Sequence, residues 1–180
     1  MLVAVAGCGG GGGSGTELES GPTVAGFAFT SESAVAEGQP IAARFTCDGQ
    51  DVSPALAWEG VPEGVQELAL AVEDPDAPGG TFTHWLVYRI PPTATELPAG
   101  DRGWTGYGPG SPQEGENDFG DTGYGGPCPP GDEEHRYVFR LRALHEPVRL
   151  EPGADRSEFD AAVAGFLLAE ARLTATYARN

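Results

Sequence analysis

Lysine is absent from this 180-residue sequence, and all ten of its basic residues are arginine. Against them stand 27 acidic residues, which gives a formal net charge of −17. Such a surface repels nucleic-acid phosphates and anionic lipid headgroups, so we expect no nucleic-acid partner. It also destabilises a compact state unless salt screens the charges. The composition therefore favours a halophilic source, and an ordinary acidic protein from a GC-rich genome is the alternative.

Long apolar runs are also missing. No segment approaches the roughly 20 apolar residues that a membrane-spanning helix requires. Residues 1–22 do not resemble globular sequence, and the remaining stretch of about 160 residues suits one domain with one core. We therefore divide the chain into an N-terminal signal remnant and linker, 1–22, and a single domain, 23–180.

Cysteine is scarce, with three in the chain. Cys8 follows small and apolar residues as in a lipobox, and the glycine-rich run after it, 9–15, resembles a flexible tether. This pattern predicts an exported lipoprotein anchored to the outer face of the cell membrane. The segment lacks the basic start and longer apolar stretch of a secretory signal, so a chance cysteine in a disordered terminus is the alternative. Outside the cell, Cys47 and Cys128 would form an even pair able to make a disulfide.

Apolar periodicity predicts a mostly β domain. The expected strands cover 23–30, 40–46, 55–58, 67–73, 83–90, 135–144 and 173–177. The strand at 135–144 alternates, with His135, Tyr137, Phe139 and Leu141 on one face and Arg136, Val138, Arg140 and Arg142 on the other.

One helix is expected near the C-terminus. Ser157 and Asp160 have the spacing of a capping box, and Phe159, Val163, Phe166 and Leu167 follow at helical spacing. Between the strands lies a Gly- and Pro-rich loop, 98–134, whose length is typical of a functional or a disordered segment.

Polar residues gather where the expected strands begin and end. Asp74 and Asp76 follow the apolar strand 67–73, His84 begins the next strand, and His135 begins a third after the stiff loop 123–130. Each feature alone also fits a tight turn or an ordinary strand residue. Two of the chain's three histidines follow rigid loops in this way, and such positions are where binding sites are usually built.

These segments occur in a recognisable order. They are Phe45-Thr46-Cys47-Asp48-Gly49, Ser53-Pro54-Ala55-Leu56-Ala57-Trp58, Asp74-Pro75-Asp76-Ala77-Pro78, His84-Trp85, the run from Gly123 to Pro130, and His135-Arg136-Tyr137-Val138-Phe139. Over about residues 24–178 the chain resembles the bacterial and archaeal, Raf-kinase-inhibitor-like branch of the phosphatidylethanolamine-binding protein family.

The resemblance implies an antiparallel β-sandwich with a short C-terminal helix, a long Gly/Pro-rich loop and an anion pocket at one end of the sheet. The implied ligand-binding residues are Asp74, Asp76, His84, His135 and Tyr137, with Gly125, Pro127 and Pro129 in the wall; Tyr177 is a candidate for closing the pocket. Imidazole and tyrosine donors with backbone N–H groups suit a phosphate. An aspartate fits if it orients a histidine and stabilises its protonated form, or if it holds a shared proton.

The expected function is thus non-enzymatic binding of a small anion or a phospholipid headgroup, with no cofactor, no metal and no catalytic residue. One alternative is inhibition of a protease or kinase by protein–protein contact. Another is an enzyme, in which two histidines and a carboxylate hold a metal or Ser53, His84 and Asp74 act as a hydrolase triad. The chain has neither a Gly-x-Ser-x-Gly elbow nor a His-Glu-x-x-His helix, which disfavours both enzymes.

Overall fold

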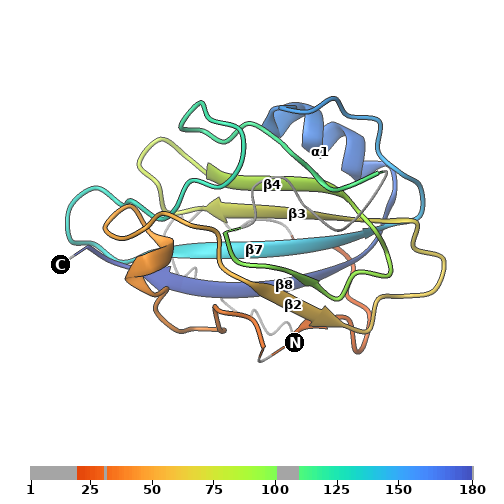
Figure 1. The fold of residues 1–180 in the computed structure, drawn as a ribbon, viewed down its shortest axis with the longest axis horizontal. Coiled ribbons are helices and arrows are strands. Elements are labelled where there is room, and N and C mark those ends of the chain that lie inside the picture. Colours follow the sequence, from red (N-terminus) through yellow and green to blue (C-terminus); the bar gives the residue numbers. More distant parts are fainter. Residues whose placement is uncertain (1–19, 31, 101–109, 180) are drawn as a thin grey trace, which may run out of the picture.

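Two antiparallel sheets make up the domain. The computed structural model describes residues 20–30, 32–100 and 110–179. A five-stranded sheet has the order β6-β4-β3-β7-β8, and a smaller one has the order β1-β2-β5 (Figure 1). The strands are β1 (Ala28–Phe29), β2 (Leu56–Glu59), β3 (Glu67–Asp74), β4 (Phe82–Ile90), β5 (Glu96–Leu97), β6 (Gln113–Glu114), β7 (His135–Leu144) and β8 (Leu167–Tyr177). The helices are the 3-10 turn η1 (Ala43–Phe45) and α1 (Arg156–Ala164).

Strand β3 is the centre of the larger sheet. Every residue from Glu67 to Asp74 is buried, and the strand pairs with β4 on one side and β7 on the other. A nearly continuous apolar run is expected of a strand covered on both faces. The sequence prediction for this strand is confirmed to within one residue.

The two faces of the larger sheet pack against different partners. One face joins the smaller sheet in a core that includes Trp58, Leu70, Trp85 and Phe139. The other face is covered by α1, and Phe159 contributes to this second core (Figure 1). The architecture is the predicted β-sandwich with one short helix.

The helix begins two residues earlier than the sequence prediction. Asp155 is the N-cap, and its carboxylate accepts the Glu158 N–H at 2.9 Å while Glu158 accepts the Asp155 N–H at 3.0 Å. The predicted Ser157–Asp160 box is wrong because Asp160 instead pairs with Arg142 of β7 and Arg156 of α1. The helix ends at Ala164, so Phe166 and Leu167 lie beyond it and β8 starts at Leu167.

The predicted strand at 40–46 is also wrong. Pro40 forms one isolated bridge to Thr176, and the chain then turns through η1. The Thr46 hydroxyl donates to the Ala43 carbonyl at 2.9 Å, which closes the turn. Gly49 packs so closely on this turn that an added Cβ would lie 2.1 Å from the Ala43 oxygen. The local turn therefore overrides the weak alternation.

Further expectations concern the final strand, the long loop, membrane spans and the N-terminal linker. The final strand, predicted at 173–177, extends back to Leu167, and the long loop contains the short edge strand β6. Within the described ranges no helix is long and apolar enough to cross a membrane. Cys8 and most of the predicted linker lie outside the described residues.

Candidate functional site

Four strand ends meet at one end of the five-stranded sheet. Asp74 ends β3 opposite Phe82 at the start of β4, and His135 starts β7 opposite Tyr177 at the end of β8. In an antiparallel sheet the end of one strand lies beside the start of its neighbour. The order of the strands therefore gathers most of the predicted polar residues at this end of the sheet.

His135 and Asp74 form the first contact of the site. The Nδ1 atom of His135 lies 2.7 Å from Oδ2 of Asp74, and both side chains are almost fully buried. An ionised carboxylate only accepts hydrogen bonds, so Nδ1 carries the proton. The other oxygen of Asp74 accepts the backbone N–H of Asp76 at 2.8 Å, which holds the carboxylate in place. His135 is thereby oriented with Nε2 as its only remaining polar atom.

His84 occupies a bulge in β4. Val72 faces Trp85 and Glu73 faces Thr83 across the β3–β4 pair, which leaves His84 as the extra residue. Bulges re-aim a side chain and are frequent next to functional sites. The His84 backbone carbonyl accepts the Gly125 N–H at 2.9 Å, and the His84 Nδ1–H donates to the Gly125 carbonyl at 2.7 Å.

The pKa of His84 lies below its ordinary value because the ring is buried. The Gly125 carbonyl and the charge of Asp74 act in the opposite direction and offset part of this effect. His84 is therefore neutral at neutral pH, with its proton on Nδ1 and a lone pair on Nε2. An anion placed against Nε2 would require the ring to take up a proton.

Tyr137 lies beside His84 on the core face. The centroids of the two rings are 5.2 Å apart in an edge-on arrangement, and Tyr137 is fully buried. Its hydroxyl makes no well-directed hydrogen bond to the described part of the chain. Burial, together with the nearby charge of Asp74, raises the pKa of Tyr137. The hydroxyl stays protonated and can act as a donor to a ligand.

Asp76 has a different role from that of Asp74. Arg136 donates to its carboxylate from Nε at 2.9 Å and from Nη2 at 2.7 Å, and the Arg136 backbone N–H donates at 2.9 Å. These hydrogen bonds lower the pKa of Asp76. The sequence reasoning named Asp76 as a ligand contact and overlooked Arg136, although Arg136 stands beside His135 in the same motif.

A glycine-rich loop forms the wall next to His84. Cys47 and Cys128 are joined by a disulfide with a Cα–Cα distance of 5.5 Å, and the Cys47 N–H donates to the Pro127 carbonyl at 3.2 Å. The predicted cysteine pairing is confirmed. Gly125 and Pro127 are buried in this wall, and Pro129 is buried immediately after Cys128.

Glycine is required at the point of closest approach. A Cβ on Gly125 would lie 2.5 Å from the ring of Phe119, and a Cβ on Gly126 would lie 2.4 Å from the Phe45 carbonyl oxygen. The Gly126 N–H donates to Asp51 at 2.7 Å. The sequence reasoning did not identify Asp51, which precedes the Ser53 motif by two residues.

A hollow of about 470 Å³ lies on the disulfide side of this loop. Its lining includes Cys47, Asp51, Asn117, Phe119, Tyr124, Gly125 and Gly126. Phe119 is 48% exposed, and its ring centroid lies 4.7 Å from that of Phe82 and 5.5 Å from that of His84. Phe119 is thus an exposed apolar residue at the edge of the histidine site. Its position in the irregular loop offered no periodic signal that could have identified it.

Tyr177 sits at the same end of the sheet, directly opposite His135. Its hydroxyl donates to Asp48 at 2.9 Å, and Arg179 pairs with the same carboxylate at 2.9 Å. In this structure Tyr177 therefore ties the C-terminal strand to the loop that carries Cys47.

The arrangements considered for an enzyme can be compared with the described part of the chain. No three His, Cys, Asp or Glu side chains there are grouped to hold a metal ion. A Ser–His–Asp relay uses both ring nitrogens of the histidine, and Nδ1 of His84 is bonded to the Gly125 carbonyl. The Ser53 hydroxyl accepts the Gly100 N–H at 3.0 Å.

Comparison with known proteins now identifies the family. The model of the phosphatidylethanolamine-binding protein family matches residues 31–178. The chain belongs to this family. A "UPF0098 protein" of Methanothermobacter thermautotrophicus is 45% identical over 140 residues, which covers 78% of this chain and 91% of that protein.

This chain is also similar to a protein that is named as a lipoprotein and to two proteins of solved structure. The "Putative lipoprotein LppC" of Mycobacterium tuberculosis H37Rv is 39% identical, covering 79% of this chain and 68% of its own. The crystal structure of Escherichia coli YbcL superposes with a TM-score of 0.79 at 34% identity, covering 87% and 100% of the two chains. The homologue CT736 of Chlamydia trachomatis has a TM-score of 0.76 at 33% identity, covering 86% and 98%.

Proposed function

We propose that this chain is a non-enzymatic binding protein for a small phosphate- or carboxylate-bearing ligand, such as a phospholipid headgroup, held by His84, His135 and Tyr137. The supporting observation is that the protein itself uses Nδ1 of both buried histidines, on Gly125 and Asp74, and leaves only Nε2 of each ring for a ligand. The Tyr137 hydroxyl adds a third donor.

The proposed binding is linked to protonation. Burial keeps His84 neutral at neutral pH, and a neutral ring with its proton on Nδ1 offers an anion no donor at Nε2. An anion at the site would favour the imidazolium, so the ligand and a proton bind together. The affinity should therefore rise as the pH falls, with the useful range lying below the ordinary histidine value of about 6.5.

Calorimetry tests the proposal with inorganic phosphate and O-phosphorylethanolamine as probes. The His84→Ala and His135→Ala variants should each weaken binding roughly tenfold to a hundredfold, since each loses a charge-assisted hydrogen bond. The matched control is His145→Ala, because His145 packs against Phe166 at the opposite end of β7 and should leave the affinity unchanged. Equal affinities in all four proteins would refute the site.

The proposal includes a lipid anchor on Cys8. The lipobox-like residues before Cys8, the glycine-rich tether after it and the lipoprotein name of a relative support this assignment. Intact-mass measurement of protein from native membranes should show added lipid, and Cys8→Ser should release the chain into the soluble fraction. Wild-type protein without lipid mass in that fraction would refute the anchor.

One observation favours protein contact as a second candidate function. Phe119 exposes 48% of its surface beside His84, and aromatic residues are enriched in protein–protein interfaces. Inhibition of a protease or kinase through this surface should be lost in Phe119→Ser while phosphate affinity persists. A panel of such enzymes assayed with both proteins separates this role from anion binding.

A further inference from the structure

A second group of polar side chains lies on the other face of the larger sheet, beneath α1. It lines a groove of about 460 Å³ between the helix and strands β7 and β8. The charged lining is Arg140, Arg142, Arg156, Asp160 and Glu170, and Val163, Ala164 and Leu167 are apolar neighbours. None of these residues belongs to the histidine site.

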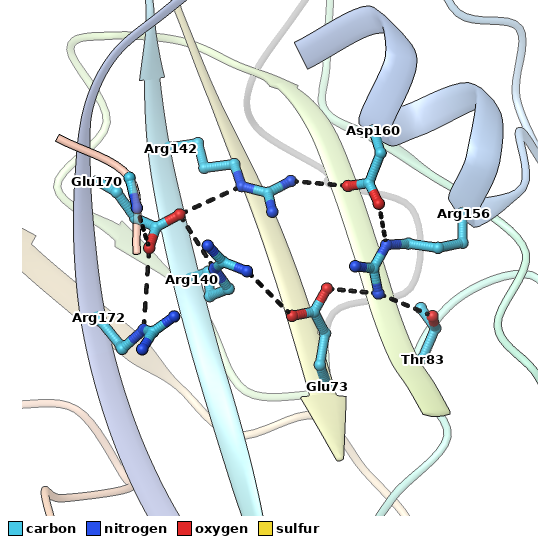
Figure 2. A network of polar contacts seen from close by, with 9 residues as sticks. Glu73, Thr83, Arg140, Arg142, Arg156, Asp160, Glu170 and Arg172 are labelled. Atoms are coloured by element: carbon cyan, nitrogen blue, oxygen red, sulfur yellow. Dashed lines mark hydrogen bonds and ion pairs between the residues drawn. The ribbon is translucent and has the colours of Figure 1, made fainter. Parts of the chain in front are cut away.

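These side chains form a network of ion pairs that joins several elements. Figure 2 shows four arginines, Arg140, Arg142, Arg156 and Arg172, in one network with the three carboxylates Glu73, Asp160 and Glu170. Glu73 is fully buried, and Arg140 and Arg142 each expose 8% of their side chains. Buried charge is costly unless it is compensated.

Asp160 holds two of the guanidinium groups at the groove. Arg142 donates from Nη1 to one Asp160 oxygen at 3.1 Å, and Arg156 donates from Nε to the other. Figure 2 shows Arg142 reaching this carboxylate from β7 and Arg156 reaching it from α1. The remaining bonds of these arginines use Nε of Arg142 and Nη1 of Arg156. The Nη2 group of each donates to no residue that the structure describes.

Both arginines are held in position before any ligand arrives. The Arg142 guanidinium lies 5.5 Å from the centroid of the Phe159 ring, and Arg156 is 75% buried against Glu73 and Thr83, since its side chain exposes 25%. A planar guanidinium fork matches the oxygens of a phosphate or carboxylate. Donors fixed in advance lose little conformational entropy on binding.

The N-terminal arm reaches the same groove. The Glu170 N–H donates to the Pro22 carbonyl at 2.7 Å, the Gly21 N–H donates to the Glu170 carboxylate at 3.4 Å, and Ser20 lines the groove. Ser20, the first residue that the structure describes, thus lies at the rim of the groove. A lipid anchor on Cys8, twelve residues before Ser20 (20 − 8), would keep this face near the membrane surface.

We propose that the groove is a second oxyanion site, in which Arg142 and Arg156 bind a phosphate group and Asp160 occupies part of their bonding capacity when the phosphate is absent. The phosphate is either free in solution or part of a lipid headgroup. Binding here involves neither histidine of the first site. The proposed Cys8 anchor matters only if the phosphate belongs to a lipid headgroup, because a free phosphate can reach the groove without it.

NMR titration of the folded domain with inorganic phosphate tests the site. The side-chain Nε–H signals of Arg142 and Arg156 should shift in a saturable way, together with the backbone amide of Ala164. The first site reports separately through the amides of Gly125 and Gly126. The His84→Ala variant should leave the response of the arginines unchanged, so failure of either site is visible independently of the other.

Two variants decide between a binding site and a purely structural network. Arg156→Gln should weaken phosphate binding at the groove roughly tenfold or more. Asp160→Asn removes a competing, 41% exposed carboxylate and should tighten it by roughly twofold to fivefold. The control is Arg149→Gln, which removes an exposed arginine outside the network.

A gain in Asp160→Asn cannot arise from loss of the fold, so it supports the site even if Arg156→Gln is unstable. No saturable shift at the two arginines, or weaker binding in Asp160→Asn, would overturn the proposal. Vesicles identify the source of the phosphate. Arg156-dependent binding to phosphatidylglycerol vesicles indicates a headgroup, whereas a response to inorganic phosphate alone indicates a free phosphate.

Discussion

Asp74 and His135 are 61 residues apart in the chain, yet the carboxylate of one accepts the Nδ1–H of the other at 2.7 Å. The contact forms because β3 ends where its neighbour β7 begins. It orients His135 within the site. The same carboxylate stabilises positive charge on His84, whose pKa it raises against the larger effect of burial.

Asp74→Asn should therefore shift phosphate binding to lower pH. The amide oxygen can still accept the His135 Nδ1–H, but the charge that favours a protonated His84 is lost. Phosphate affinity measured between about pH 5 and 8 reports the shift. Asp76→Asn is the control, because it removes the same charge from a carboxylate engaged by Arg136. An identical shift in the two variants would contradict a specific role for Asp74.

His84 should make the ligand-free protein less stable in acid. Its folded-state pKa is lowered by burial, so the unfolded chain binds the proton more tightly. The contribution of neutral His84 to the free energy of unfolding is fully present above the unfolded-state pKa of about 6.5. It decreases as the pH drops toward the folded-state pKa. Each pKa unit by which folding lowers the pKa of His84 corresponds to a loss of about 1.4 kcal/mol in the free energy of unfolding at low pH.

Denaturant titrations of the wild type and His84→Asn across this pH range measure the effect. The asparagine can still donate to the Gly125 carbonyl but does not titrate, so its stability should fall less steeply. Parallel curves for the two proteins would show that His84 is not responsible. Added phosphate should flatten the wild-type curve, because the proposed ligand favours the protonated ring.

Removing the Cys47–Cys128 disulfide should cost stability and loosen the wall of the site. The bridge spans 81 residues, and the chain-entropy estimate for such a loop is about 4–5 kcal/mol. The double Cys→Ser variant should unfold at correspondingly lower denaturant, and the Gly126 amide should exchange faster. Cys8→Ser, which leaves the bridge intact, is the control. Equal unfolding midpoints for the double variant and the control would contradict the estimate.

The net charge of −17 predicts a strong dependence on salt. Screening reduces repulsion among the carboxylates, so the Tm should be markedly higher in molar KCl than in dilute buffer. Sucrose at equal osmolality is the control, because it stabilises by exclusion from the surface without screening charge. A Tm that does not respond to KCl would remove the basis for a halophilic source.

Much of the fold could be predicted because periodicity records which residues are buried. The run 67–73 is apolar throughout because β3 is covered on both faces. The alternation in 135–144 assigns Tyr137 and Phe139 to the core between the sheets. The disulfide was likewise predicted, on the expectation that Cys8 carries a lipid in an exported protein and leaves Cys47 and Cys128 as an even pair.

The pairing of polar groups followed from tertiary structure alone. Sequence predicted that Asp74, Asp76, His84 and His135 belong to one site. It could not predict that Asp74 accepts a hydrogen bond from His135, or that Arg136 pairs with Asp76. These choices depend on strand register, and on a bulge that only the β3–β4 pairing reveals.

The arginine groove shows the same division. Sequence placed Arg140 and Arg142 on the face of the strand opposite the core residues, where arginines are ordinarily exposed. The structure buries them because α1 packs over this face and the partners Glu73, Asp160 and Glu170 arrive from three different elements. A local pattern determines which way a side chain points along its own strand. The residues that the side chain contacts depend on how distant segments pack against the strand, and this packing exists only in the folded domain.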